Sequence, residues 1–229
     1  MRRNLTLPAL LLGLALVGLI ITAGCIGTDN TPATFFSGTG NDSIATELPA
    51  GVYILTITQT SAEMTDVTVE TKETGTSIQG RYSDAAAESA ETAKGWIWSY
   101  ALQTDGKPTL IINATGDWNA DFAVPQQIDG IPPQIFQGTG NAATPFFMIN
   151  KGNISFAIEA TNNTALEVHL MDYNGNPVMD ETNSFEQPLA YHLGEYHNTV
   201  IVPLTDSDNY LLNIICDGDW SVTVTDKQA

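Results

Sequence analysis

A duplicated pattern of turn and strand residues constrains the fold of this chain more than any other feature. Residues 36–41 read FSGTGN, and residues 136–141 read FQGTGN. Each copy is followed by an apolar run that closes in Gly-Asp-Trp, first as LIINATGDW (residues 110–118) and then as LLNIICDGDW (residues 211–220). Matching start and end signals at one spacing are typical of a duplicated domain. We therefore expect two copies of one module in tandem.

The residues between these signals favour strands over helices. Runs rich in Val, Ile, Thr and Tyr alternate with Gly, Asn and Asp, and the clearest is VYILTITQ at residues 52–59. Asn174-Gly175 between two apolar runs predicts a hairpin with a type I′ turn. Short strands at this density predict an all-β fold, and we expect two tandem β-sandwiches of the jelly-roll kind. An alanine-rich segment at residues 85–93 carries good helix formers and has no counterpart in the second copy.

The domain boundaries follow from the same pattern. We assign residues 34–123 to the first sandwich and residues 135–225 to the second. Residues 124–134 (VPQQIDGIPPQ) contain three prolines, which favour an extended, stiff linker. Residues 1–24 are interpreted as a signal peptide, and residues 25–33 as a cysteine and a polar tether.

The N-terminal segment carries the pattern of an export signal. Arg2 and Arg3 form a basic start, residues 5–21 are almost wholly apolar, and small residues lead up to Cys25. Small residues before a cysteine resemble the lipobox of prokaryotic lipoproteins, which implies lipidation of the Cys25 thiol and cleavage before it. Thr22 departs from that box, where an aliphatic residue is usual. An uncleaved membrane anchor and a plain secreted protein stay open as alternatives.

Each copy also resembles the β-sandwich modules of exported prokaryotic proteins that are related to bacterial pre-peptidase C-terminal domains. The resemblance rests on the turn at residues 136–141, the strand at 152–158, the hairpin at 172–175 and the closing stretch at 210–224. It implies non-catalytic accessory modules, because these motifs are structural. The low count of Lys and Arg, together with N-x-S/T sequons, favours an archaeal source.

The charge balance excludes some partners. The chain has 26 acidic and 8 basic side chains, for a net charge of −18. Such a field disfavours nucleic acid and anionic lipid surfaces and favours solubility. We expect no cofactor beyond weak Ca²⁺ binding by acidic loops. Residues 172–176 resemble the start of a calcium loop, but their glycine is fourth where an EF-hand has it sixth, so the hairpin is the better interpretation.

Three aromatic residues are the candidate ligand-binding site. Trp96, Trp98 and Tyr100 alternate along one predicted strand and therefore share a face. They would form a row about 13 Å long. If the row is exposed it can stack on sugar rings, and if it is buried it belongs to the core. Trp118 and Trp220, at the ends of the two copies, are predicted to fill the cores.

Other candidate residues carry weaker signals. His192, Glu195 and His197 do not predict a metal site, because an odd separation places the two histidines on opposite faces of a straight strand. We expect no metal centre. Cys216 follows two isoleucines and is predicted to be a buried core residue. With Cys25 lipidated, no intrachain disulfide can form.

The four N-x-S/T sequons that follow the leader are candidate glycosylation sites in an exported protein. Asn41, Asn153 and Asn162 are the better candidates, since Asn113 lies within a predicted strand.

The motifs favour a binding or scaffolding role over catalysis. The chain has no G-x-S-x-G and no H-E-x-x-H. We expect a non-catalytic lipoprotein, anchored by lipid to the outer face of the cell membrane, that acts in cell-envelope interaction or scaffolding with a glycan or protein partner. The alternative is a lipoprotein that recognises a glycan or another extracellular ligand through the aromatic row. An envelope hydrolase is the residual alternative.

Overall fold

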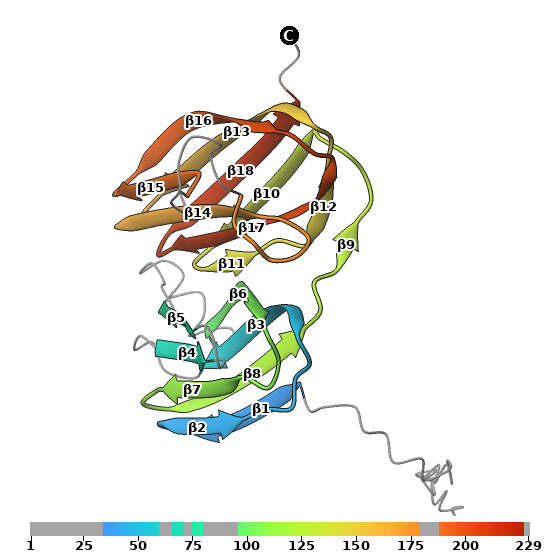
Figure 1. Cartoon of the computed structure of the whole chain (residues 1–229). Coiled ribbons are helices and arrows are strands. Elements are labelled where there is room, and N and C mark those ends of the chain that lie inside the picture. The colour runs from blue at the N-terminus through green and yellow to red at the C-terminus, as the bar shows by residue number, and fades with distance from the viewer. Residues whose placement is uncertain (1–33, 60–65, 71–74, 80–95, 179–187, 227–229) are drawn as a thin grey trace, which may run out of the picture. The chain divides into compact units, whose positions relative to one another are not determined.

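The computed structural model describes residues 34–59, 66–70, 75–79, 96–178 and 188–226, with the side chains of 75–79 and Trp96 left out. Every regular element within these ranges is a β-strand (Figure 1). The first half contains β1 (Phe35–Thr39), β2 (Asp42–Ala45), β3 (Gly51–Gln59), β4 (Asp66–Glu70), β5 (Gly75–Gln79), β6 (Trp96–Thr104), β7 (Thr109–Asn113) and β8 (Asp117–Ala123). The alanine-rich segment lies outside the described residues.

The remaining strands form the second half. They are β9 (Gln127–Ile128), β10 (Gln134–Thr139), β11 (Ala142–Ala143), β12 (Phe146–Ile149), β13 (Gly152–Thr161), β14 (Ala165–Met171), β15 (Ala190–Leu193), β16 (Tyr196–Leu204), β17 (Asp208–Cys216) and β18 (Asp219–Asp226). The strand predicted most clearly, at residues 52–59, is β3 (Gly51–Gln59), and the all-β fold is confirmed.

Each half consists of two sheets. In the first half their strand orders are β1-β8-β3-β6 and β2-β7-β4-β5. In the second half the orders are β10-β18-β13-β16 and β15-β14-β17-β12-β9, and β11 also pairs with β17. The strand pairs are antiparallel except for β9 and β12. This arrangement is the one expected of β-sandwiches.

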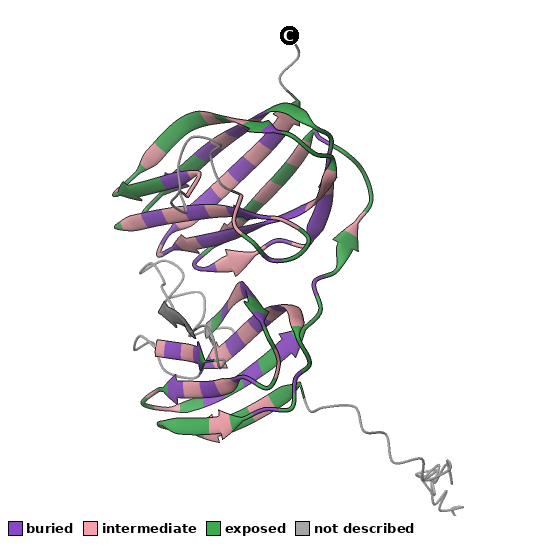
Figure 2. Ribbon diagram, in the orientation of Figure 1, coloured by how far each residue is buried: buried purple, intermediate pink, exposed green. Residues whose placement is uncertain are grey.

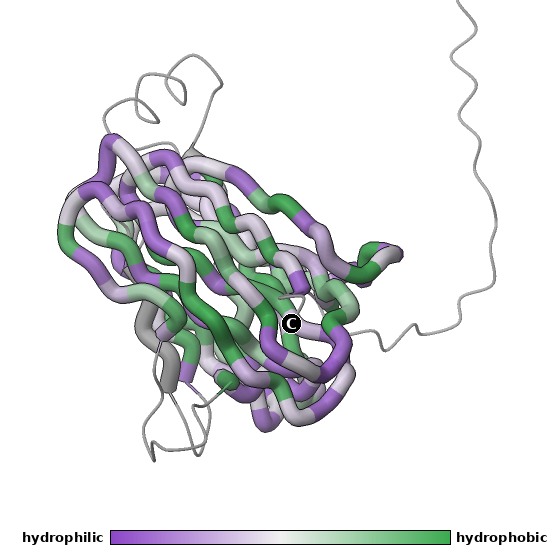
Figure 3. Tube along the Cα trace, turned by 90° about the horizontal axis from the view of Figure 1, so that it is seen from above, coloured by the Kyte–Doolittle hydropathy of each residue, from purple (hydrophilic) through white to green (hydrophobic). Residues whose placement is uncertain are grey.

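Alternating side chains explain why the sheets pack face to face. Along β8, Trp118, Ala120 and Phe122 are buried and the residues between them are exposed. The same alternation of buried and open positions runs along most strands in Figure 2, and hydropathy varies along the strands in Figure 3. Because successive strand residues point to opposite faces, each sheet gains one apolar face. Each half thus has its own apolar core, one around Phe122 and the other around Phe156.

The duplicated motif closes one corner of each sandwich. In the first half, Gly40 donates its N–H to the carbonyl of Gly116 at 3.0 Å. The indole N–H of Trp118 donates to the carbonyl of Gly40 at 2.9 Å, and the hydroxyl of Thr39 donates to Asp117 at 2.6 Å. The second half repeats these bonds at the same distances, from Gly140 to Gly218, from Trp220 to Gly140 and from Thr139 to Asp219. The motif is therefore a structural frame.

The first glycine of each GTG turn provides room for the tryptophan. A Cβ on Gly38 would lie 2.5 Å from the Trp118 ring, and one on Gly138 would lie 2.6 Å from the Trp220 ring. Such distances leave no space for a side chain, so the rings lie directly on the backbone. Trp118 and Trp220 are 1% and 6% exposed, which confirms that they belong to the cores.

The hairpin after β14 forms, but its turn type differs from the prediction. Gly175 donates its N–H to the carbonyl of Asp172 at 2.9 Å, so the central turn residues are Tyr173 and Asn174. Of residues 172–176, only Gly175 has a positive φ, at 84°. A type I′ turn needs positive φ at both central residues, whereas a type I turn followed by a left-handed glycine needs one. The Asp172 carboxylate selects this form by accepting the N–H groups of Asn174 and Asn176 at 2.9 and 2.8 Å.

Part of the predicted linker belongs to a sheet. Gln127 and Ile128 form β9, which pairs in parallel with Phe146 and Phe147 of β12. The peptide bond between Pro132 and Pro133 is cis. Residues 32–229 belong to one compact unit. Within the described ranges, no helix has the length and apolar character needed to cross a bilayer.

Candidate functional site

The aromatic row predicted on β6 does not form an open platform. Trp98 is 1% exposed, and its indole N–H donates to the side-chain carbonyl of Gln59 at 3.2 Å. Tyr100 is half-buried and packs against the core of the first half. Trp96 belongs to β6, but its side chain lies outside the described residues. Of the two alternatives left open for the row, the core is the one that holds for Trp98, which has no free ring face to stack on a sugar.

The strand register explains why these aromatics point inward. Trp98 lies opposite Ile57 and Tyr100 opposite Leu55, and both β3 residues are fully buried. Directly paired residues share a face of the sheet. The other face of β6 carries Ile97, which is 64% exposed. Alternate residues of β6 point to opposite faces of the sheet, but only the pairing with β3 decides which of these two faces is buried.

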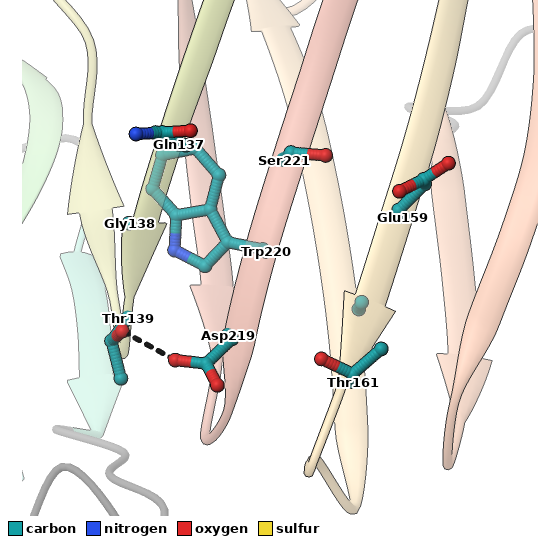
Figure 4. A pocket seen from close by; sticks show the side chains of 9 residues that line it. Gln137, Gly138, Thr139, Glu159, Thr161, Asp219, Trp220 and Ser221 are labelled. Carbon is teal, nitrogen blue, oxygen red and sulfur yellow. Dashed lines mark hydrogen bonds between the residues drawn. The ribbon is translucent and has the colours of Figure 1, made fainter.

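An open polar groove of about 440 Å³ lies along β10, β18 and β13 of the second half. Figure 4 shows its side chains in two cross-strand rows. The rows are Gln137–Ser221–Glu159 and Thr139–Asp219–Thr161. These side chains point outward because the alternate residues Phe136, Val222 and Ile158 pack in the core.

Hydrogen bonds fix part of the groove. The carboxylate of Asp219 accepts the Thr139 hydroxyl at 2.6 Å and the Asn162 amide at 3.2 Å. At the other end, Glu159 lies 3.0 Å from Nδ1 of His197, and both side chains are exposed. The fixed Asp219 end and the exposed Glu159 end thus line the open groove with hydrogen-bond donors and acceptors. Such a surface can hydrogen-bond a polar ligand.

Only one row of the groove is repeated in the first half. Thr39 and Asp117 reproduce the pair formed by Thr139 and Asp219. The other row differs: Ser37, Asn119, Thr58 and Ile97 stand where the second half has Gln137, Ser221, Glu159 and His197. The Gln137 row is thus specific to the second half. Sequence reasoning missed it because its members come from four strands, although all four positions differ between the copies.

The histidine group predicted not to bind metal is split between two strands. His192 lies in β15 and His197 in β16, with Gly194 at φ 86° between the strands. The ring of His192 is 5.3 Å from that of Tyr196, whereas His197 pairs with Glu159. Among the described residues, no three His, Cys, Asp or Glu side chains gather in a metal-binding cluster.

The cysteine and the sequon candidates occupy different environments. Cys216 is fully buried, as predicted. Asn41, Asn153 and Asn162 are all exposed, and so is Asn113. The side-chain oxygen of Asn41 accepts the N–H of Ala114 at 3.1 Å, and Asn162 donates to Asp219, so these two side chains also take part in folding contacts. Cys25 lies outside the described residues.

One carboxylate beside the second corner has an altered pKa. Burial raises the pKa of Asp217, but hydrogen bonds from the Thr164 hydroxyl and from the N–H groups of Ala165 and Thr164 outweigh it, so the net pKa is lowered. The two N–H bonds are 3.1 and 2.7 Å long. Asp217 is therefore held charged and ties the loop before β14 to the end of β17.

Comparison with known proteins adds no argument about function. No family model and no curated protein matches the chain. One of the solved structures that it resembles is described as "Structure of infectious bursal disease virus Gx strain". The match is 8% identical and covers 86% of this chain and 72% of that chain, with a TM-score of 0.17. A likeness at this level says nothing about what the chain binds or does.

Proposed function

We propose that this chain is a non-catalytic cell-surface lipoprotein whose two β-sandwiches act as an interaction or scaffolding module of the cell envelope. The observation that carries the proposal is the use of the repeated motif. The motif makes the same hydrogen bonds in both halves. In each copy a Thr hydroxyl donates to an Asp carboxylate, and a Trp indole N–H donates to a Gly carbonyl. Because the repeated residues hold the fold in both halves, we place ligand binding on the outward faces, where the two halves differ.

The polar groove of the second half is the surface on which we place recognition. Gln137 and Glu159 flank Ser221 on neighbouring strands, and together they present amide, hydroxyl and carboxylate groups in one row. This row fits the hydroxyl groups of a glycan or the backbone of a protein segment. The glycan alternative therefore moves from the aromatic row to this groove, because Trp98 is buried.

The leader supplies the proposed location. Lipidation at Cys25 would hold the module on the outer face of the membrane. The eight residues of the tether, 26–33, reach at most about 30 Å when extended. Mass spectrometry of the membrane-extracted protein tests this part. We expect a diacylglyceryl mass on an N-terminal Cys25, and an unmodified Cys25 in the membrane fraction contradicts it.

The binding proposal is tested by screening residues 26–229 against glycans and cell-wall material, with and without calcium. We expect binding to an envelope component, and we expect the Gln137→Ala/Glu159→Gln variant to weaken it by about thirtyfold, since each of the two lost polar partners is worth roughly 1 kcal/mol. The matched control is Ser37→Ala/Thr58→Ala, at the equivalent positions of the first half. Equal losses in both variants contradict the groove, and turnover of hydrolase substrates contradicts the non-catalytic role.

A further inference from the structure

A buried asparagine of the second half bonds to the backbone of the first half. Asn213, in β17, has no exposed surface. Its side-chain oxygen accepts the N–H of Ala101 at 2.7 Å, and its side-chain nitrogen donates to the carbonyl of Ala101 at 2.7 Å and to the Met171 sulfur at 2.9 Å. These bonds give both the oxygen and the nitrogen of the buried amide partners in place of water.

The bonded backbone belongs to an edge strand. β6 is the last strand of the sheet β1-β8-β3-β6, so one side of its backbone faces away from β3. At Ala101, the Asn213 carboxamide supplies one acceptor and one donor, as a neighbouring strand would. Two residues earlier, the Ser99 N–H donates to the carbonyl of Asn141 at 3.2 Å, and the Ser99 hydroxyl accepts the N–H of Ala143 at 3.1 Å. The second half thus closes the edge of β6.

Comparing equivalent positions shows that the closing face is specific to the second half. Asn213 lies opposite Ala143, and Ile111 lies opposite Ser43 at the same register in the first half. The second half has the apolar residues Met171, Leu211 and Ala143 where the first half has Glu70, Thr109 and Ser43. Met171 and Leu211 form an apolar cluster with Ala101 and Phe146. At these three positions the face is polar in the first half and apolar in the second.

The edge strand that corresponds to β6 in the second half is protected in another way. β16 is the last strand of its sheet, and its residue Ile201 is 44% exposed at the position of Ala101. The Thr199 N–H is taken by the side chain of its own neighbour Asn198 at 2.8 Å, and Pro203 has no N–H to offer. Proline and local caps on an edge strand discourage pairing with another strand.

We propose that the second half carries an internal docking surface for the edge strand β6, and that Asn213 is the residue that recognises this edge. Its carboxamide supplies the strand-like pairing, and the apolar cluster around Met171 supplies the buried area. The edge of β6 is thereby covered by the second half, whereas the edge of β16 is blunted by Asn198 and Pro203. This inference concerns the assembly of the chain and does not depend on the proposed function.

The test compares amide hydrogen exchange in residues 26–229 and in the same chain with Asn213→Leu, which keeps the branched shape of the side chain but loses both bonds to Ala101. We expect the Ala101 amide to exchange about tenfold faster in the variant, because its N–H and C=O lose their partners. Core amides such as those of Leu55 and Phe156 should change by no more than about twofold. The matched control is Asn198→Ala on the other edge, which should leave Ala101 unchanged.

A second measurement keeps the proposal falsifiable if the variant does not fold. In the native protein, the side-chain NH₂ protons of Asn213 should exchange far more slowly than those of an exposed asparagine such as Asn153. Slow exchange at Asn213 supports the docking surface. Rapid exchange there, or unchanged protection of Ala101 in a folded Asn213→Leu variant, overturns it.

Discussion

The first and second halves hold their Gly-Asp-Trp corners with the same hydrogen bonds, yet their outward faces carry different residues. At the corner, the indole of each tryptophan donates to a glycine carbonyl at 2.9 Å. Outside the corner, Glu70 corresponds to Met171 and Ile111 to Asn213. The shared residues are those that a sandwich needs to fold. The differing residues have different surroundings: Asn213 and Met171 contact Ala101 of β6, whereas Glu70 is exposed.

The largest expected effect tests whether the two corners are equivalent. Trp118→Ala and Trp220→Ala should each lower the free energy of unfolding by about 3–5 kcal/mol, because each removes a buried indole and leaves a cavity. Urea denaturation of residues 26–229 measures both losses. Phe35→Ala, at a residue that is 59% exposed, is the control. If the loss in free energy of unfolding in one tryptophan variant is less than half that in the other, the two corners do not contribute equally to stability.

An exchange of outer-face residues tests the difference between the halves. Met171→Glu should lower the free energy of unfolding by about 2–4 kcal/mol, since it places a polar group in the apolar cluster beside Ala101. The reciprocal Glu70→Met, on an exposed position, should change it by no more than about 0.5 kcal/mol. Thermal unfolding of the two variants measures the contrast. Similar effects would mean that the face around Met171 does not meet the first half.

The smallest expected effect concerns the loop that precedes β14. The lowered pKa of Asp217 means that its hydrogen bonds stabilise the fold above the unfolded pKa of about 3.9, and that this contribution is lost as pH falls through the folded pKa. Asp217→Asn should therefore remove part of the stability gained between acid and neutral pH, on the order of 1 kcal/mol.

The equivalent position of the first half provides the control for this prediction. Thr115 precedes Gly116 as Asp217 precedes Gly218, and it has no carboxylate to titrate. The measurement is the urea midpoint from pH 3 to pH 7. In Thr115→Asn the midpoint should change with pH as in the native protein, whereas in Asp217→Asn it should change less. If the pH dependence of the urea midpoint is unchanged in Asp217→Asn, the carboxylate of Asp217 does not stabilise this loop.

Local signals in the sequence were sufficient for the strands and the frame. The alternation in residues 52–59 predicts β3, and the copied FxGTGN and Gly-Asp-Trp stretches predict two like modules with Trp118 and Trp220 in their cores. These features depend on period and on turn residues within a few positions of one another. The Asn174-Gly175 hairpin was predicted, but the predicted type I′ turn was wrong, because the Asp172 carboxylate accepts the N–H groups of Asn174 and Asn176.

The sequence by itself determined that Trp98 and Tyr100 share one face, and the tertiary structure alone decided that this face is inside. The reason is that pairing with β3 sets the orientation of β6, and such pairing joins residues about forty positions apart. The same limit applies to the Gln137 row, whose members come from different strands, and to Asn213, which bonds to a residue 112 positions away. Differences between two copies of a motif mark these places, but only strand register shows whether a difference faces solvent, a ligand or the other half.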